Sequence, residues 1–301
     1  MKVILVAGAT GQQGGSVIRA LSDSEDYFCL ALTRNPESQK AQKLKPMKNL
    51  KLVRGDLNDV QELRTVFEDA KSDPSGAIWG VFVALEYPGL GANADGEERQ
   101  GKNIATIAQE FGVESYIFSS TVMLPSPEDK PPIPGTDRYA KTSIEKHVAS
   151  LTIPWTTQPT AEFFIPQALD DVGRFSRHIF DNPSRFDRKT LNVATKGLEA
   201  KEFNRIFLQA TGYDIPSVPK FIMTSVYWLN RDVRGMIDDF VLADDMRKLD
   251  PQRYDANIQE AASYVEPTTF EEWARKFNET SDKEVNEHHI TLWGLIGGKT
   301  R

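Results

Sequence analysis

The first two dozen residues restrict the possible folds more than any other part of the chain. Residues 2–7 (KVILVA) form a short apolar run of the kind that a buried parallel strand shows. Three glycines follow with the spacing G-x-x-G-x-x-G, and the next turns place Val17, Ile18 and Leu21 on one helical face. Such glycines allow a tight turn, a close backbone approach to a phosphate and close packing of helix on strand. Because the start of the helix also offers unpaired N–H groups and a positive dipole end, this segment predicts a nucleotide-binding strand–turn–helix unit.

The residue after the second apolar run bears on which dinucleotide such a unit takes. Residues 27–33 (YFCLALT) predict the second strand, and Arg34 follows it about 20 residues after the glycine turn, where these folds recognise the ribose. An acid there accepts from a 2′-hydroxyl and repels a 2′-phosphate, whereas an arginine favours the phosphate. Arg34 therefore predicts NADP(H) in preference to NAD(H), with Ser38 and Lys40 near enough to assist. The alternative is a solvated arginine at the end of a strand.

A further candidate contact follows the third strand, which we expect at residues 50–54. Asp56 is placed to accept a hydrogen bond from an adenine amino group, with Leu57 against the ring. Alternatively, Asp56 or Asn58 caps the helix expected around residues 60–69.

Strands and helices continue to alternate to about residue 160. The expected elements are a helix at 37–44, a strand at 77–85, a helix at 95–111, a strand at 113–119, a helix at 137–150 and a strand at 155–157. This alternation predicts an α/β fold with a doubly wound parallel sheet of the Rossmann type. Ligands of such sheets bind outside the carboxyl ends of the strands, so Val83, Ala84 and Leu85 are expected to lie over the cofactor.

The second half of the chain changes character and predicts a smaller C-terminal α/β lobe. We expect a dinucleotide-binding domain over residues 1–160, the lobe over 161–278 and a tail over 279–301. Within the lobe the pattern predicts a helix at 172–180, a strand at 190–193, a helix at 199–211, a largely helical segment at 227–249 and a last helix that begins at two overlapping capping boxes in 268–272. Asp170 and Asp171 are expected to cap the first of these helices rather than to hold a metal, and no metal site is expected elsewhere.

The composition limits which binding partners and which cellular compartment are expected for this chain. A net charge of −7 provides no basic surface, so we expect no direct nucleic-acid binding. Cys29 is the single cysteine, which excludes an intrachain disulfide and a cysteine-based metal site. No apolar stretch reaches the length of a membrane span, and the first apolar run breaks at Gly8, too early for a signal peptide. We therefore expect a cytoplasmic, or else nuclear, protein that does not enter a membrane.

Lys141 is the candidate catalytic residue. Ser119 or Ser120 after the fifth strand and a lysine on the next helix invite comparison with short-chain dehydrogenases, which place a tyrosine four residues before that lysine. That spacing puts both side chains on one helical face, where the cation lowers the pKa of the phenol for proton transfer. Here Asp137 takes the position, and Tyr139 points to nearly the opposite side of the helix. An i,i+4 ion pair between Asp137 and Lys141, worth roughly a few tenths of a kcal/mol, is the alternative. Cofactor binding is thus better supported than catalysis.

Eight short motifs, taken in order, allow a more specific comparison. They are Val6–Gly15 (VAGATGQQGG), Thr33–Pro36 (TRNP), Gly55–Leu57 (GDL), Trp79–Phe82 (WGVF), Gln100–Asn103 (QGKN), Phe118–Ser120 (FSS), Lys141–Glu145 (KTSIE) and Asp170–Gly173 (DDVG). Together they resemble the NmrA-like family of atypical short-chain-dehydrogenase-like proteins, and the resemblance runs to about Phe277. Its best-known members lack the catalytic tyrosine and act as regulators that sense the pyridine nucleotide state. Others, in fungal secondary-metabolite clusters, are assigned as oxidoreductases.

The resemblance implies an NADP-binding Rossmann fold and gives roles to residues of this chain. It implies that the pyrophosphate lies on Gly8, Thr10, Gly11, Gln12, Gln13 and Gly14, the 2′-phosphate on Arg34, the adenine on Asp56 and Leu57, the centre of the cofactor on Val83, Ala84 and Leu85, and the nicotinamide ribose on Lys141. Glu162 and Phe163 are expected to close over the nicotinamide.

One segment departs from the family pattern. After its sixth strand the family has several tens of residues that help to wall the substrate cleft, whereas here Phe164 is followed almost at once by Pro166 and Asp170. The cleft wall is therefore expected to be shortened, which exposes Phe163, Phe164 and neighbouring core surface.

Two functions follow as hypotheses. The leading one is an NADP(H)-binding, redox-sensing regulator, for example of transcription, whose affinity for a protein partner depends on cofactor occupancy. The other is an NADPH-dependent oxidoreductase of a small carbonyl or enone compound, in which Lys141 and a serine or a water replace the tyrosine. A third possibility is a degenerate member with a damaged cleft and no activity.

Overall fold

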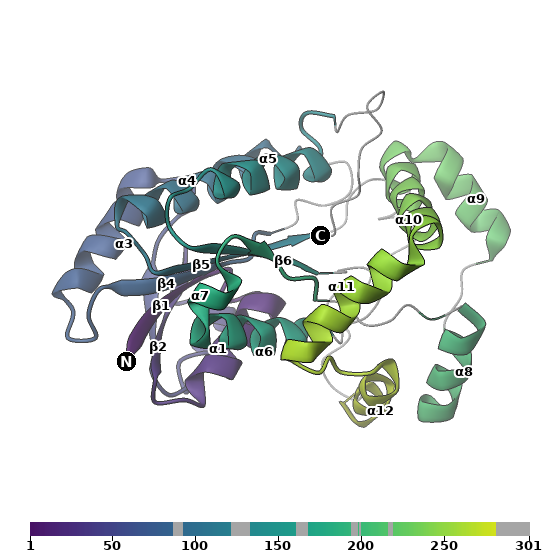
Figure 1. Cartoon of the computed structure of the whole chain (residues 1–301), viewed down its shortest axis with the longest axis horizontal. Coiled ribbons are helices and arrows are strands. Elements are labelled where there is room, and N and C mark those ends of the chain that lie inside the picture. Colours follow the sequence, from purple (N-terminus) through teal and green to yellow (C-terminus); the bar gives the residue numbers. More distant parts are fainter. Residues whose placement is uncertain are drawn as a thin grey trace.

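A computed structural model of the chain describes residues 1–86, 93–121, 133–160, 168–193, 198, 200–215 and 219–280. Its centre is a seven-stranded parallel sheet in the order β3-β2-β1-β4-β5-β6-β7 (Figure 1). The strands are β1 Lys2–Ala7, β2 Tyr27–Thr33, β3 Leu50–Arg54, β4 Ile78–Val83, β5 Ser115–Thr121, β6 Trp155–Thr160 and β7 Lys189–Thr190. β1 lies between β2 and β4, so the strand order reverses there, which confirms the predicted doubly wound parallel sheet.

Helices cover both faces of this sheet. Those of the first two thirds are α1 Gln12–Ser22, α2 Gln39–Gln42, α3 Val60–Ser72, α4 Asp95–Glu110, α5 Asp137–Ala149, α6 Ala168–Asp181 and α7 Pro183–Phe186. α3, α4 and α5 lie on one face, and α1 and α6 pack side by side on the other (Figure 1). The remaining helices are α8 Ala200–Thr211, α9 Lys220–Leu229, α10 Arg231–Leu249, α11 Pro251–Tyr264 and α12 Phe270–Thr280. None of the described helices is long and apolar enough to cross a membrane.

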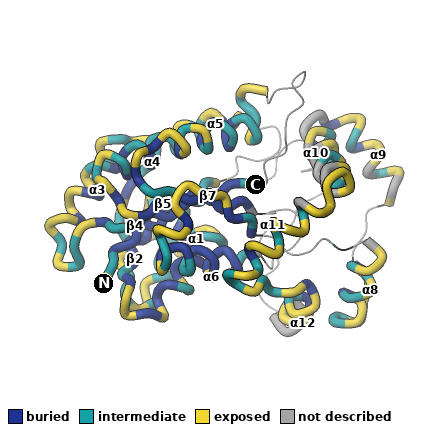
Figure 2. The backbone as a smooth tube through the Cα atoms, viewed as in Figure 1, coloured by how far each residue is buried: buried dark blue, intermediate teal, exposed yellow. Residues whose placement is uncertain are grey.

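Alternate residues of each central strand enter different apolar cores. Val3, Leu5 and Ala7 of β1 pack with α3, α4 and α5, whereas Ile4 and Val6 pack with α1, α6, α7 and α11. Both faces of the central strands are therefore buried, as Figure 2 shows, which is why these strands read as continuous apolar runs rather than as alternating patterns. A smaller third cluster joins Phe207 of α8 to Phe270 and Ala274 of α12.

The first 160 residues follow the predicted elements closely, with two corrections. The helix expected at 37–44 is confined to α2, because Ser38 caps it by accepting a hydrogen bond from the Ala41 N–H at 3.3 Å. The cap of α3 is Asp59, which accepts from the N–H groups of Gln61 and Glu62, and neither Asp56 nor Asn58 caps this helix.

The second half departs further from expectation. The helical segment expected at 227–249 is two helices, α9 and α10, because Asn230 ends the first and accepts from the Val233 N–H at 3.1 Å to begin the second. The sequence did not predict α7 or α11. β7 pairs with β6 as an added strand of the main sheet, and the Val193 N–H extends this edge by donating to the Pro159 carbonyl at 2.9 Å.

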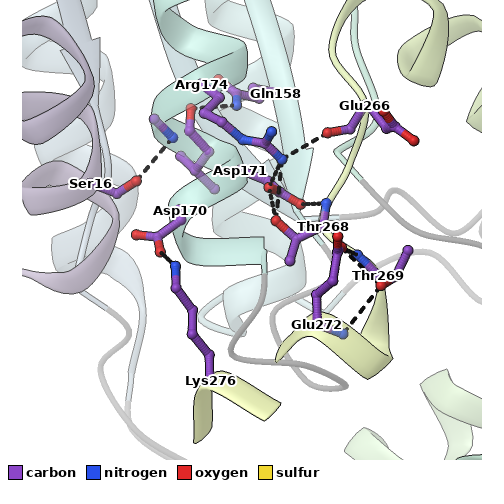
Figure 3. Close-up of polar contacts among 12 residues, drawn as sticks. Ser16, Gln158, Asp170, Asp171, Arg174, Glu266, Thr268, Thr269, Glu272 and Lys276 are labelled. Atoms are coloured by element: carbon purple, nitrogen blue, oxygen red, sulfur yellow. Dashed lines mark hydrogen bonds and ion pairs between the residues drawn. The ribbon is translucent and has the colours of Figure 1, made fainter. Parts of the chain in front are cut away.

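Asp170 and Asp171 lie within the first turn of α6 and tie three segments together (Figure 3). Asp171 is 1% exposed and accepts hydrogen bonds from the Thr268 N–H at 2.9 Å, from the Thr268 hydroxyl at 2.7 Å and from Arg174. Asp170 forms exposed ion pairs with Arg19 of α1 at 3.0 Å and with Lys276 of α12 at 3.4 Å. The predicted capping role is therefore wrong, since both carboxylates instead join α6 to other segments.

The start of α12 is built by only one of the two predicted capping boxes. The Thr269 hydroxyl accepts from the Glu272 N–H at 3.2 Å, and the Glu272 carboxylate accepts from the Thr269 N–H at 2.8 Å. Thr268 does not form the second box, because its N–H donates to Asp171 and its hydroxyl oxygen accepts from Arg174 at 3.2 Å. Figure 3 shows that this cap and the Asp171 contacts follow one another along the chain, which fixes where α12 starts.

The two neighbouring aspartates are expected to differ sharply in their contribution to stability. Asp171→Asn removes a buried charge with three donors and is expected to cost about 2–3 kcal/mol, since hydrogen bonds to charged groups contribute about that much. Asp170→Asn weakens only exposed ion pairs and is expected to cost less than about 1 kcal/mol. Urea unfolding of both variants measures the difference. Equal losses would contradict this account of the contacts.

Candidate functional site

The glycine turn is held by three close backbone approaches. Gly8 has a φ of +80°, and a Cβ at this position would lie 2.2 Å from the carbonyl oxygen of Ala84. A Cβ at Gly14 would lie 2.3 Å from the carbonyl oxygen of Gly8, which also accepts from the Gly11 N–H at 2.9 Å. A side chain at Gly8 or Gly14 would therefore force the turn, the helix and β4 apart.

The N-terminus of α1 opens onto this turn. Its N-cap residue is Gly11, which has no side chain to accept from the first-turn N–H groups, and no acidic residue lies in that turn. Gly11 and Gln12 are exposed, while Gly8, Thr10 and Gln13 are half-buried. A helix start of this kind can bind an anion through its backbone N–H groups and its dipole.

Gln13 reaches from this turn across the end of β4, beside the point between β1 and β4 where the strand order reverses and where such sheets form a ligand-binding crevice. The Ser119 hydroxyl of β5 donates to its Oε1 at 2.6 Å, a contact that spacing in the sequence does not predict. The contact spans β4 from one side to the other, because β4 lies between β1 and β5. Gln13 thus joins the helix start to the carboxyl end of β5, with Ser119 itself buried.

The carboxyl end of β4 forms the opposite wall of the turn. Val83 pairs in register with Ala7 and is fully buried, and the Ala84 N–H donates to the Ala7 carbonyl at 3.1 Å. Ala84 and Leu85 are half-buried. Of the three residues expected over the cofactor, Val83 therefore faces the core with its side chain, and only its backbone can line the crevice.

Arg34 is exposed at the carboxyl end of β2, where it was expected. Its Nη2 lies 3.5 Å from Oε2 of Glu86, which follows the carboxyl end of β4, so the ion pair crosses the end of β1. Glu86 was missed because only the strand order brings residues 34 and 86 together. Ser38, also expected near a phosphate, uses its hydroxyl to cap α2.

Asp56 and Leu57 lie at the carboxyl end of β3. Asp56 Oδ1 accepts from the backbone N–H of Asn58 at 2.9 Å and from its side-chain amide at 3.0 Å, which closes a local turn. The Leu57 side chain packs against the apolar core, and its carbonyl accepts from Asn103 of α4 at 2.9 Å. The two residues are thus held rigidly at the edge of the sheet.

Lys141 lies in a buried charged cluster between α4, α5 and β5. Its Nζ is 2.8 Å from Oε1 of Glu97, and both side chains are less than 10% exposed. The Nζ also lies 5.5 Å from the centre of the Phe118 ring. Its ion-pair partner is therefore Glu97 on α4, and the alternative pair with Asp137 is wrong.

A second carboxylate, Glu145, approaches the same lysine. Burial raises the pKa of Glu145, while a hydrogen bond from Ser120 and the charge of Lys141 oppose that rise. Its Oε1 has no hydrogen-bond partner among the described residues. Glu97 and Glu145 were missed by the sequence analysis. The available signal was the position of Glu97 in the first turn of the helix that follows β4.

Two predicted site residues, Glu162 and Phe163, lie outside the described part of the chain, as does Phe164. The remaining predicted residues lie at three places along the carboxyl edge of the sheet, of which the first is the end of β3 with Asp56 and Leu57. The glycine turn, Arg34 and the end of β4 gather around β1, and Lys141 lies farther along, beside β5. This edge is where open parallel sheets bind their ligands.

Comparison with known proteins identifies the family. The family model described as the NmrA-like family matches residues 1–167, more than half of the chain. The chain belongs to the NmrA-like family. An NmrA-like family domain-containing protein of Dictyostelium discoideum is 26% identical over 250 residues, which cover 70% of this chain and 78% of that protein.

Other members of the NmrA-like family carry the name oxidoreductase. The oxidoreductase hkm9 of Aspergillus hancockii is 34% identical over 121 residues, which cover 40% of this chain and 33% of that protein. The match thus spans about a third of that oxidoreductase's length.

Solved NmrA structures share the fold over nearly the whole chain. A mutant NmrA superposes with a TM-score of 0.67 at 20% identity, covering 93% of this chain and 96% of that one. NmrA described as a negative transcriptional regulator in complex with NADP gives 0.63 at 18% identity, with the same coverage of both chains. An enzyme from Bordetella bronchiseptica in complex with NAD+ gives 0.56 at 16% identity, covering 73% of this chain and 84% of that one. Structural neighbours of this NmrA-like chain therefore bind dinucleotides.

Two adjacent glycines of the NmrA-like turn are expected to respond in opposite directions to alanine. Gly14→Ala places a Cβ against the Gly8 carbonyl and is expected to destabilise the fold by about 1–3 kcal/mol. Gly15→Ala meets nothing closer than 3.6 Å and is expected to stabilise α1 by up to about 1 kcal/mol through helix propensity. Chemical denaturation of the two variants tests this. Stabilisation by both would contradict the close approach at Gly8.

Proposed function

We propose that this chain binds NADP(H) and acts as a redox-sensing regulator through a protein partner. The observation that carries the proposal is the glycine turn: a helix start without a side-chain cap opens onto the crevice where the strand order reverses. The NmrA complex with NADP, whose fold this chain shares, supports the choice of cofactor. Arg34 supports it further, since a guanidinium suits a 2′-phosphate better than a 2′-hydroxyl.

The proposed binding mode follows the carboxyl edge of the sheet. The pyrophosphate is assigned to the turn from Gly8 to Gly14, with Asp56 and Leu57 toward the adenine. The backbone of residues 83–85 lies toward the centre of the cofactor and Lys141 toward the nicotinamide ribose. Bound NADPH would supply a hydride, and the residues of this chain would bind and orient it.

A regulatory role has a physical basis in the contacts of α1. Arg19 of α1 is ion-paired with Asp170 of α6, and the Ser16 hydroxyl accepts from the Gly173 N–H at 3.1 Å. Asp170 is in turn ion-paired with Lys276 of α12. An anion at the start of α1 thus acts on a helix that is joined to the C-terminal segments. A partner that contacts those segments can bind the occupied and empty states with different affinities.

An NADPH-dependent oxidoreductase of a small carbonyl or enone compound is the second candidate. The fungal oxidoreductases among the relatives favour it. So does the cluster of Lys141, Ser120 and Glu145, which holds exchangeable protons beside the carboxyl end of β5. Asp137 opposes it, because a carboxylate occupies the position from which a phenol would donate a proton.

Titration of the purified protein with NADPH and NADP+ distinguishes the two candidates. We expect calorimetry to detect binding of both forms, and the absorbance of the nicotinamide to stay constant across a panel of carbonyl compounds. Substrate-dependent oxidation of NADPH would favour the oxidoreductase instead. Absence of binding to either form would contradict both candidates.

Arg34→Ala is expected to weaken NADPH binding by roughly tenfold or more, because a charge-assisted contact to a phosphate contributes about 1.5–3 kcal/mol. NADH binding should change little, since NADH has no 2′-phosphate. Glu86→Gln removes the carboxylate that pairs with Arg34 and should tighten NADPH binding.

The matched control for Glu86→Gln is Glu25→Gln, which removes an exposed acid between α1 and β2 at the opposite edge of the sheet. Calorimetric dissociation constants for both dinucleotides measure all of these effects. An equal loss of NADPH and NADH affinity in Arg34→Ala would contradict the 2′-phosphate assignment.

A further inference from the structure

Lys141 is ion-paired with Glu97, a residue to which the proposed binding mode assigns no role. Glu97 is 4% exposed, lies in the first turn of α4 and forms the 2.8 Å ion pair with Lys141 in the second turn of α5. In the chain α4 is the helix that follows β4, and α5 is the helix that follows β5, so both helices begin on the carboxyl side of their strands. Lys141 also lies near Phe118, which pairs in register with Val83. The ion pair is therefore built at the edge where the dinucleotide is proposed to lie.

The two carboxylates near Lys141, those of Glu97 and Glu145, differ in their contact with its ammonium group. From α4 it faces Glu97, from its own helix Glu145, and from β5 the Phe118 ring, while Ser120 of β5 acts on Glu145. The carboxylate of Glu97 forms the ion pair, with its Oε1 2.8 Å from Nζ of Lys141, whereas Glu145 acts on the lysine through its charge and has its pKa raised by burial. Among the described residues, Glu97 is thus the carboxylate in direct contact with the ammonium group.

The neighbouring acid on α4 has separate partners. Oε1 of Glu98 lies 2.5 Å from Nζ of Lys102 and accepts from the Ser143 hydroxyl at 2.7 Å. These contacts also link α4 to α5, but they do not include Lys141. Glu98 therefore offers a matched comparison for Glu97, with the same side chain one position along the same helix.

We propose that Glu97 is the positioning residue that keeps Lys141 charged and oriented for the nicotinamide-side ribose of the cofactor. This rests on the proposed function, in which Lys141 contacts that ribose. A buried amine without a counter-ion favours its neutral form, and a neutral amine loses the charge-assisted hydrogen bonds that an ammonium group donates. Glu97 thereby makes the affinity for the dinucleotide insensitive to pH over the neutral range.

The test compares NADPH affinity by calorimetry between pH 7 and pH 9 in the unaltered chain, Glu97→Gln, Glu97→Asp and Glu98→Gln. Glu97→Gln is expected to lose roughly tenfold in affinity as the pH rises, because Lys141 then releases its proton within this range. Glu97→Asp keeps a carboxylate and should restore a flat profile. Glu98→Gln should stay flat as well. A flat profile in Glu97→Gln, or a slope in Glu98→Gln equal to it, would overturn the proposal.

A second readout separates this proposal from the proposed function. Carbon-13 spectra of labelled lysine follow the charge of Lys141 without any dinucleotide, with Lys141→Arg used to assign the resonance. Loss of the charged form below pH 9 in Glu97→Gln, but not in Glu98→Gln, supports the role of Glu97. If that loss occurs and no variant binds NADPH, the proposed function fails while the control of the Lys141 charge stands. If Lys141 keeps its charge in Glu97→Gln, the proposal is wrong.

Discussion

The close approach of three backbone segments at Gly8 is the constraint on which the rest of the site depends. The turn after β1, the first turn of α1 and the end of β4 meet there without a side chain between them. A Cβ at Gly8 or Gly14 would lie within 2.3 Å of a carbonyl oxygen, so neither position accepts a larger residue unless the segments separate. Because β4 is also hydrogen-bonded in register with β1, the crevice and the helix start above it are fixed together.

A second close approach connects this region to the C-terminal part of the chain. A Cβ at Gly173 would lie 2.4 Å from the Ser16 carbonyl oxygen, so α6 can pack against α1 only with glycine at this position. The exposed ion pairs of Asp170 contribute little to this connection, since water and salt screen them. The buried Asp171 contributes more, because its carboxylate accepts from both the N–H and the hydroxyl of Thr268, and hydrogen bonds to a buried charge are stronger than exposed ion pairs. The connection between α1 and the C-terminal segments therefore rests more on packing at Gly173 and on the hydrogen bonds of Asp171 than on the exposed ion pairs.

The sequence predicted most reliably what depends on local pattern. β1, β2 and β3 have the predicted bounds, because each is a short apolar or alternating run between polar breaks. The turn after β1 was also predicted, because the spacing of its glycines depends only on the local backbone conformation. Prediction failed where several neighbouring residues are able to cap the same helix. At the start of α3 the N-cap is Asp59, whereas Asp56 or Asn58 was predicted.

Prediction also failed where a contact joins residues far apart in the chain. Glu97 lies 44 positions before Lys141, and Glu86 lies 52 positions after Arg34. Only the order of strands in the sheet brings these pairs together, and a single sequence gives no pairwise signal for it. The local i,i+4 rule favoured Asp137 for Lys141, yet the buried carboxylate across the helix interface is the partner. In each case the ion-pair partner is determined by tertiary packing, about which the local sequence pattern gives no information.

The charge arrangement around Lys141 is the observation that bears on the choice between the two proposed functions. Reduction of a carbonyl needs a proton donor beside the developing alkoxide, and the related dehydrogenases obtain it from a phenol that a nearby lysine acidifies. Here the lysine is paired with a buried carboxylate at 2.8 Å, so much of its field is cancelled before it can act on a neighbour. The same pair is well suited to hold an ammonium group in one place, since its two side chains are both buried and come from adjacent helices. A cation fixed in this way is suited to orienting a hydroxyl group, as the proposed contact of Lys141 with the nicotinamide-side ribose requires.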